Sequence, residues 1–91
     1  MIKIHGNDIY VDSMKIGLIN GNRVYDRADK ELGYFTSDSV YDASGERLAH
    51  IEGNYIYSGN KQMKLEEVIG NVEGIGLSNV ARAAISAFFG K

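Results

Sequence analysis

The sequence predicts a mainly β fold: an antiparallel meander of four hairpin repeats of about 16 residues in a pseudo-fourfold ring or small barrel, followed by one C-terminal α-helix. A Val/Ile-Tyr pair recurs four times, and its tyrosines are spaced by 15, 16 and 16 residues. These repeat tyrosines are Tyr10, Tyr25, Tyr41 and Tyr57. The 91-residue chain also has 11 glycines and no proline, which suits strands joined by tight turns because proline cannot donate to a sheet ladder. We expect a single domain over residues 1–91, with the hairpin repeats in residues 1–69.

Each repeat is predicted to contain two strands. The first strand follows a Gly-Asn-x start or a variant of it, which opens at Gly6, Gly21, Ser37 and Gly53. The second strand covers residues 16–19, 32–35, 48–51 and a degraded copy at 63–65. β-Branched and aromatic residues bounded by Gly, Asn or Asp are typical of strands, and the period is too short for a helical repeat.

Two kinds of turn are predicted to alternate along the meander. Asp42-Ala43-Ser44-Gly45 has an Asp that can accept hydrogen bonds from the backbone ahead of it, and a Gly where a type I turn with a bulge needs a positive φ. Asp26-Arg27-Ala28-Asp29 repeats this pattern with Asp29 in the glycine place. Between repeats, Asn20-Gly21 and Glu52-Gly53 are predicted to form two-residue hairpin turns.

The two residues of each Val/Ile-Tyr pair should lie on opposite faces of the sheet, because neighbours on a strand alternate. A flat meander would leave one of these faces and both edges exposed, whereas a ring puts the branched residues inside. The branched residues are Ile9, Val24, Val40 and Ile56. The small residues after each Ile/Leu then mark places where strands bend or approach closely, and they are Gly17, Gly33 and Ala49.

The end of the chain departs from the repeat. Residues 68–72 read as one more short strand, residues 70–76 as a connector, and residues 77–89 as an amphipathic helix capped by Ser78 or Asn79. The helix has one apolar stripe, with Arg82 and Ser86 on its opposite face. The stripe comprises Leu77, Val80, Ala81, Ala84, Ile85 and Phe88. We expect this helix to plug an open end of the ring or to form a dimer contact.

The copies of Gly-Asn-x-Val/Ile-Tyr, followed by Asp-x-x-Gly and Leu/Ile-Gly, resemble the bacterial four-fold beta flower domain. In that family short β-hairpins surround a central pseudo-fourfold axis. The resemblance covers roughly residues 1–70 and implies a fold without a function, since the motif carries no catalytic residue and the family has no established role. The chain departs from the pattern where Ser37-Asp38 replaces Gly-Asn and where Tyr57-Ser58-Gly59-Asn60 lacks the Tyr-Asp pair.

The candidate ligand-binding residues are the four repeat tyrosines and His50. On a ring, the tyrosines would form a circle of phenols suited to a glycan or a peptide. The alternative, which we favour, is that each tyrosine packs across strands with its hydroxyl in water. His50 takes the repeat place of Leu18 and Tyr34, and His5 is the only other histidine. No spacing typical of a metal site or of a catalytic serine is found, so we predict no metal, no cofactor and no catalytic residue.

Charge and composition exclude several classes of protein. Ten Lys and Arg residues stand against 12 Asp and Glu, and a net charge of −2 argues against a nucleic-acid binder, which needs a basic face. No segment is long and apolar enough to span a membrane. Residues 1–6 lack the apolar region of a secretory signal, and the absence of cysteine fits reducing conditions, so we expect a cytoplasmic protein.

The leading functional hypothesis is a non-enzymatic binding or protein-interaction module, because the distinctive residues serve turns and packing. A second hypothesis is a glycan-binding or peptide-binding site on the repeat tyrosines. A third is a small enzyme that uses His50 or a carboxylate as its acid or base. The adjacent Phe88 and Phe89 point in different directions on a helix, so Phe89 leaves the apolar stripe and suggests a homo-oligomer contact.

Overall fold

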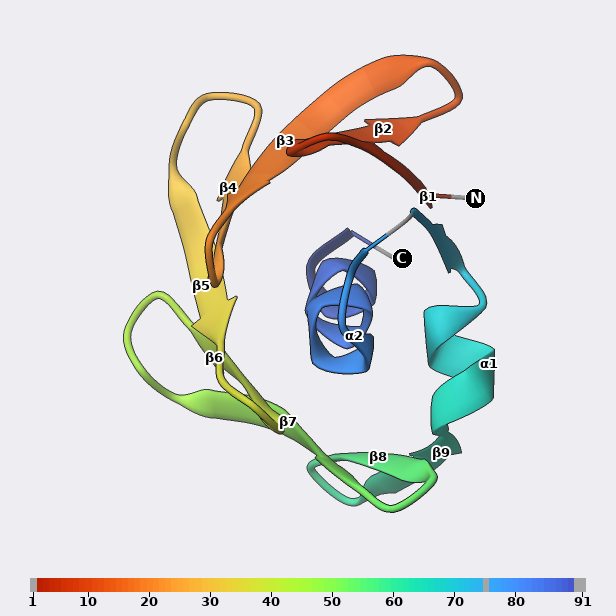
Figure 1. Ribbon diagram of the computed structural model, residues 1–91. Helices are drawn as coiled ribbons and strands as arrows, with labels where there is room; N and C mark the ends of the chain where they lie inside the picture. The colour runs from red at the N-terminus through yellow and green to blue at the C-terminus, as the bar shows by residue number, and fades with distance from the viewer. Residues whose placement is uncertain (1, 75, 90–91) are drawn as a thin grey trace.

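Ten strands form one sheet that curves around a helix (Figure 1). The computed structural model describes residues 2–74 and 76–89. The strands are β1 (Ile2–His5), β2 (Asp8–Val11), β3 (Met14–Asn20), β4 (Arg23–Asp26), β5 (Glu31–Phe35), β6 (Ser39–Asp42), β7 (Arg47–Glu52), β8 (Tyr55–Ser58), β9 (Lys61–Lys64) and β10 (Val72–Glu73). The helices are α1 (Leu65–Ile69) and α2 (Asn79–Phe89).

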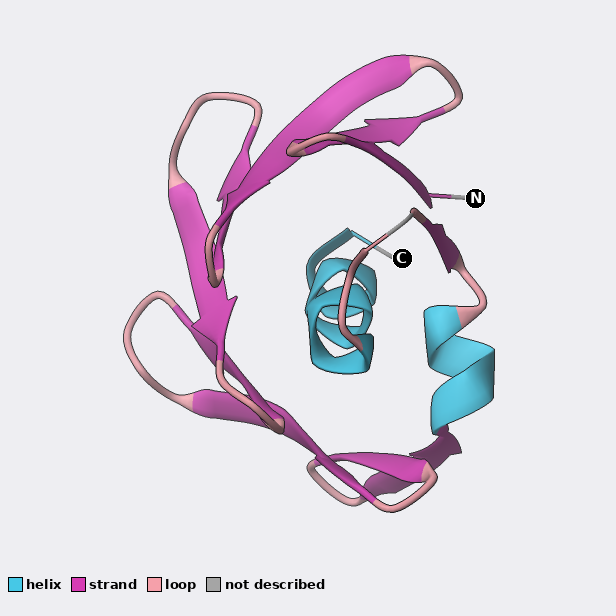
Figure 2. Ribbon diagram, in the orientation of Figure 1, coloured by secondary structure: helices cyan, strands magenta, loops and turns pink. Residues whose placement is uncertain are grey.

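The sheet order is β10-β1-β2-β3-β4-β5-β6-β7-β8-β9, so β1 to β9 form the predicted antiparallel meander. The mainly β fold of hairpins with a C-terminal helix is thereby confirmed. The sheet does not close: among the described residues no pairing joins β9 to β10, and α1 lies between these strands (Figure 2). The repeat predicts a closed or nearly closed ring or small barrel, and strand pairing does not close it.

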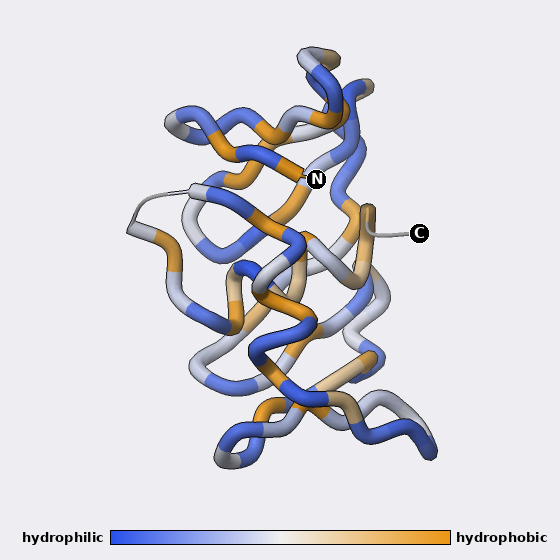
Figure 3. The backbone as a smooth tube through the Cα atoms, turned by 90° about the vertical axis from the view of Figure 1, so that its right-hand side faces the viewer, coloured by the Kyte–Doolittle hydropathy of each residue, from blue (hydrophilic) through white to orange (hydrophobic). Residues whose placement is uncertain are grey.

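The inner face of the sheet carries the core. The four branched repeat residues are at most 3% exposed, as the alternation predicted. They are Ile9, Val24, Val40 and Ile56. Helix α2 lies in the middle of the curve and buries Ala81, Ala84 and Ile85 against them. Apolar and polar residues are interspersed along each hairpin (Figure 3), because neighbouring residues on a strand point alternately to the inner face and to solvent.

A β-bulge recurs in the first three repeats. The register shifts after Ile9, after Val24 and after Val40, so the second strand of each of these hairpins has one extra residue. The extra residues are Ile16, Leu32 and Leu48. The fourth hairpin, β8 with β9, pairs without a shift. Bulges increase local twist and bend a strand, which helps the sheet to curl around α2.

The Asp-centred turns form as predicted. The Asp42 carboxylate accepts hydrogen bonds from the amides of Ser44 and Glu46, and Gly45 has a φ of 93°. Asp26 accepts the equivalent pair of bonds, and Asp29 takes the glycine place with a φ of 64°. These hydrogen bonds give the backbone amides at the tip of each hairpin a partner within the same turn.

The turns between repeats are shifted by one residue from the prediction. The loops are Gly21-Asn22 and Gly53-Asn54 rather than Asn20-Gly21 and Glu52-Gly53, because Asn20 and Glu52 end strands β3 and β7. Both glycines have a φ of 62°, while neither asparagine has a positive φ. A positive φ at the first loop residue alone is the type II′ pattern, for which glycine is preferred.

The segment after the fourth repeat differs most from the prediction. Residues 65–69 form helix α1 instead of repeat and strand, and the short strand β10 within the expected connector pairs in parallel with β1. Ile75 of the predicted connector lies outside the described residues. Helix α2 begins at Asn79 instead of residue 77, because Ser78 is the cap. The Ser78 hydroxyl accepts a hydrogen bond from the backbone amide of Ala81.

Candidate functional site

The repeat tyrosines lie on the outer face of the sheet, the side away from α2, and each sits between two cross-strand neighbours. We call these sets of three the tyrosine rows. They are Lys3–Tyr10–Lys15, Leu18–Tyr25–Glu31, Tyr34–Tyr41–Arg47 and His50–Tyr57–Gln62. The central tyrosine is half-buried in every row, whereas its two neighbours change from row to row.

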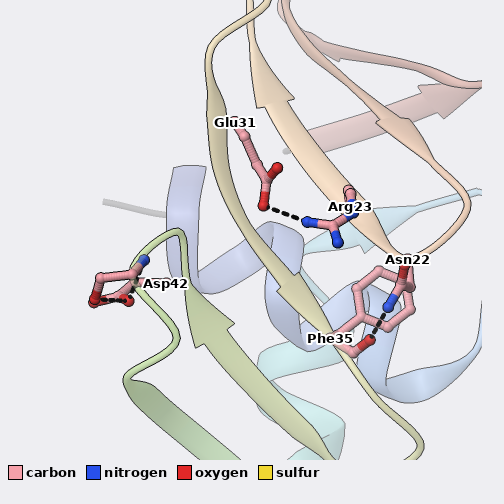
Figure 4. Close-up of polar contacts among 6 residues, drawn as sticks. Asn22, Arg23, Glu31, Phe35 and Asp42 are labelled. Atoms are coloured by element: carbon pink, nitrogen blue, oxygen red, sulfur yellow. Dashed lines mark hydrogen bonds and ion pairs between the residues drawn. The ribbon is translucent and has the colours of Figure 1, made fainter.

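Close ring contacts show that two of these tyrosines stack on neighbours in their own rows. Tyr34 and Tyr41 stack with centroids 5.1 Å apart, and His50 stacks on Tyr57 at 5.2 Å. The Arg23 guanidinium lies over the Tyr34 ring and pairs with Glu31 at 2.8 Å (Figure 4). Because the sheet curves with these residues outside, the tyrosines are spread over its outer face and do not converge on one circular dish.

His50 lies beside a carboxylate and stacks on Tyr57. Its Nε2 lies 3.8 Å from Glu52, whose side chain is 77% exposed. The hydroxyl of Ser39, which is opposite His50 in register, donates to Asp38 instead. The ligand-binding roles predicted for His50 and the repeat tyrosines stay predictions.

A polar hollow of about 580 Å³ lies beside the first tyrosine row. We call it the first-hairpin hollow, and its lining is Lys3, His5, Tyr10, Asp12 and Ser13. The His5 and Tyr10 rings meet at 84° with centroids 5.7 Å apart. A second hollow adjoins it through Lys3 and His5 and reaches Glu73.

Sequence reasoning named Tyr10 but missed His5 and the Asp12-Ser13 turn. The signal was the Gly6-Asn7 loop: a two-residue turn pairs Asp8 with His5, so His5 lies diagonally from Tyr10 on the same face. The Asp12-Ser13 loop gave only a weak signal: aspartate tolerates a positive φ, but serine is unusual there, and the two residues adopt φ values of 51° and 71°.

An apolar cleft of about 700 Å³ opens where the sheet fails to close. Strands β7 to β9 form one wall, and Ala83, Ser86 and Ala87 of α2 form another. Glu67 and Val68 of α1 complete it, and Lys61 lies on the β9 side. The cleft exists because α2 presents only small side chains in this direction.

Phe88 and Phe89 pack inside the sheet. Both are half-buried against the core, and a Cβ at Gly17 would lie 2.8 Å from the Phe89 ring. The Phe88 ring lies closer still to the Cβ position of Gly33. The helical stripe had suggested that Phe89 points away from the apolar surface. Phe89 instead packs against the core, because the sheet covers α2 on more than one side. Self-association through these residues stays a prediction.

The charged groups do not form a metal site in the part of the chain that the structure describes: no group of three potential ligands is present there. The pKa of the Asp42 carboxyl is displaced from its ordinary value. Hydrogen bonds, first from the Ser44 hydroxyl and then from the Glu46 amide, hold its pKa below the ordinary value (Figure 4). The lowered pKa is thus a consequence of the hydrogen bonds by which Asp42 caps the turn. No helix among the described residues is long and apolar enough to cross a membrane.

No protein-family model matches the chain, and no curated protein or solved structure is significantly similar to it. The resemblance to the four-fold beta flower domain stays a prediction from the repeat motif. The function has to be argued from the residues themselves.

Proposed function

We propose that the chain is a non-enzymatic binding module whose binding surface is the outer face of the sheet. The observation that carries this proposal is the contrast between the two faces. The inner face repeats the same small branched residues, while the neighbours of each repeat tyrosine change from lysines to leucine and glutamate, then to tyrosine and arginine, then to histidine and glutamine.

A constant core under a varied surface gives one rigid scaffold several different binding positions. Tyrosine and arginine are also the side chains most enriched where partners bind tightly, since they offer an aromatic face with a polar group at its end. The Arg23, Tyr34 and Tyr41 stack presents such a surface already ordered, which lowers the entropy lost on binding.

The test is to apply the labelled protein to glycan and peptide arrays and to map any ligand by NMR chemical shifts. We expect shifts at outer-face residues of the tyrosine rows. Tyr41→Ala should weaken the binding of a ligand to the third tyrosine row. Ala87→Ser, on the wall of the apolar cleft, should leave that binding unchanged. A ligand that shifts only the resonances of the cleft residues, or a ligand that the protein converts to a product, would contradict the proposal.

A further inference from the structure

We infer that the first-hairpin hollow binds one ring of a neutral saccharide. This inference rests on the proposed function, because it assigns a ligand class to one position of the outer face. It starts from the five side chains that line the hollow, which supply an ammonium, an imidazole, a phenol, a carboxylate and a hydroxyl.

The shape of the hollow comes from two rings at right angles. Tyr10 is fixed between Lys3 and Lys15 in the sheet, and the His5 and Tyr10 rings form a T-shaped pair with an interplanar angle of 84°. Such a corner offers a flat aromatic face as a floor and a ring edge as a wall. The apolar face of a pyranose can cover an aromatic ring while its hydroxyls, which project sideways, remain available for hydrogen bonds.

The polar groups around this corner suit hydroxyls. Lys3 can donate, Asp12 can accept, and Ser13 can do both, so a sugar hydroxyl meets a partner of either kind. The volume of about 580 Å³ lies in the range of small-molecule sites and exceeds what a single ring requires.

The charge balance selects a neutral ligand. Within the hollow, the positive Lys3 is offset by the negative Asp12. The nearby Lys15 forms an ion pair of 3.2 Å with Asp8, which removes it as a free cation. A carboxylate or phosphate ligand would gain from Lys3 and lose to Asp12, whereas an uncharged polyol uses both.

The turn at the rim adds an independent observation. Asp12 and Ser13 are consecutive and both have positive φ, a conformation that the other repeat turns leave to glycine or to a single residue such as Asp29. Glycine would relieve this strain but would remove the carboxylate and the hydroxyl from the hollow. Backbone strain kept together with polar side chains is typical of binding sites.

The experiment titrates isotope-labelled protein with neutral sugars, namely glucose, galactose, N-acetylglucosamine and cellobiose, with glucuronate as the anionic comparison. We expect at least one neutral sugar to shift the resonances of residues 3–15. Asp12→Asn keeps a residue that tolerates positive φ and should weaken this binding about tenfold, since a charged acceptor is lost. The Tyr10→Phe protein should fold and keep the aromatic ring on which the sugar stacks. The Tyr10→Ala change should abolish sugar binding.

Tyr25→Ala is the matched control, because Tyr25 holds the same repeat position between Leu18 and Glu31 and should leave the sugar affinity unchanged. An equal loss in Tyr25→Ala, or shifts confined to another row, would overturn this inference while leaving the binding module standing. A preference for glucuronate, a peptide seated in the hollow, or no shift with any of the sugars would also overturn it. Failure of the array experiment on every tyrosine row is the separate result that removes the proposed function.

Discussion

Gly33 faces the Phe88 ring of α2 at close range, and Gly33→Ala is a sharp test of this packing. A Cβ at Gly33 would overlap the backbone carbonyl of Tyr41 and the Phe88 ring, and would lie 3.1 Å from the Cα of Asp42. The φ of Gly33 is not positive, so alanine is allowed there by its own backbone conformation. Any loss of stability is therefore steric.

The magnitude follows from overpacking a closed core, which costs about 1–3 kcal/mol. Because one of the obstructing atoms belongs to a paired strand and cannot rotate away, we expect the upper part of that range, about 3 kcal/mol. For a domain of this size each kcal/mol lowers Tm by about 4–8 °C, so the expected shift is about 12–24 °C. The assay is urea unfolding followed by tyrosine fluorescence, for which the six tyrosines and the absence of tryptophan are convenient.

Ala49 is the natural control, because it takes the same repeat place and is buried at 5% exposure. Ala49→Gly should lose about 1.5 kcal/mol, from one buried methyl group and the added freedom of the unfolded chain. Combining Gly33→Ala with Phe88→Leu should be less harmful than the sum of the two changes, since the shorter side chain leaves room. A Gly33→Ala protein within about 0.5 kcal/mol of wild type, or strict additivity in the double variant, would refute this reasoning.

Three further predictions concern other parts of the fold. Arg82→Met should destabilise the protein by about 1.5–3 kcal/mol in the same assay, because the Arg82 guanidinium donates to the carbonyls of Val72 and Gly74, and Arg82→Lys should recover part of the loss. The pKa of Asp42 is lower in the folded state than its ordinary 3.8, so its ionised form contributes stability above that pH which is lost as the pH falls below it. Asp42→Asn should therefore be less stable than wild type at neutral pH and equal to it in acid; a difference independent of pH would contradict this. The Phe89→Asp protein should unfold more readily than wild type, and both proteins should sediment as monomers. A wild type that sediments as a dimer beside a monomeric Phe89→Asp protein would support the predicted homo-oligomer contact of the helix.

The repeat was predictable because its rules are local. Alternation along a strand placed Val24 and Tyr25 on opposite faces, and turn chemistry placed Asp29 at a positive φ, without knowledge of any partner strand. The same holds for the cap at Ser78. Each of these depends on residues within four positions of one another.

The features that the sequence did not predict depend on distant parts of the chain. Leu32 is a bulge residue only because Val24 pairs with Gly33 and Tyr25 with Glu31, and the spacing within one strand does not reveal this register. Helix α1 has five residues, too few to display an apolar period. The inward position of Phe89 was missed because a single stripe implies a helix with one covered side, whereas the sheet curves around α2.

The imperfect symmetry of the sheet follows from placing one helix inside a repeated structure. A helix presents a different residue in every direction, so identical hairpins cannot all pack on it equally. Where the sheet has Gly17 and Gly33, α2 supplies the two phenylalanine rings; where the third repeat has Ala49, α2 supplies Ala83 and the apolar cleft opens beside it. The glycine-to-alanine change in the repeat is therefore matched by a large-to-small change on the helix. Departures from the repeat motif on the inner face thus follow the shape of α2, whereas residues on the outer face are not constrained by packing against α2.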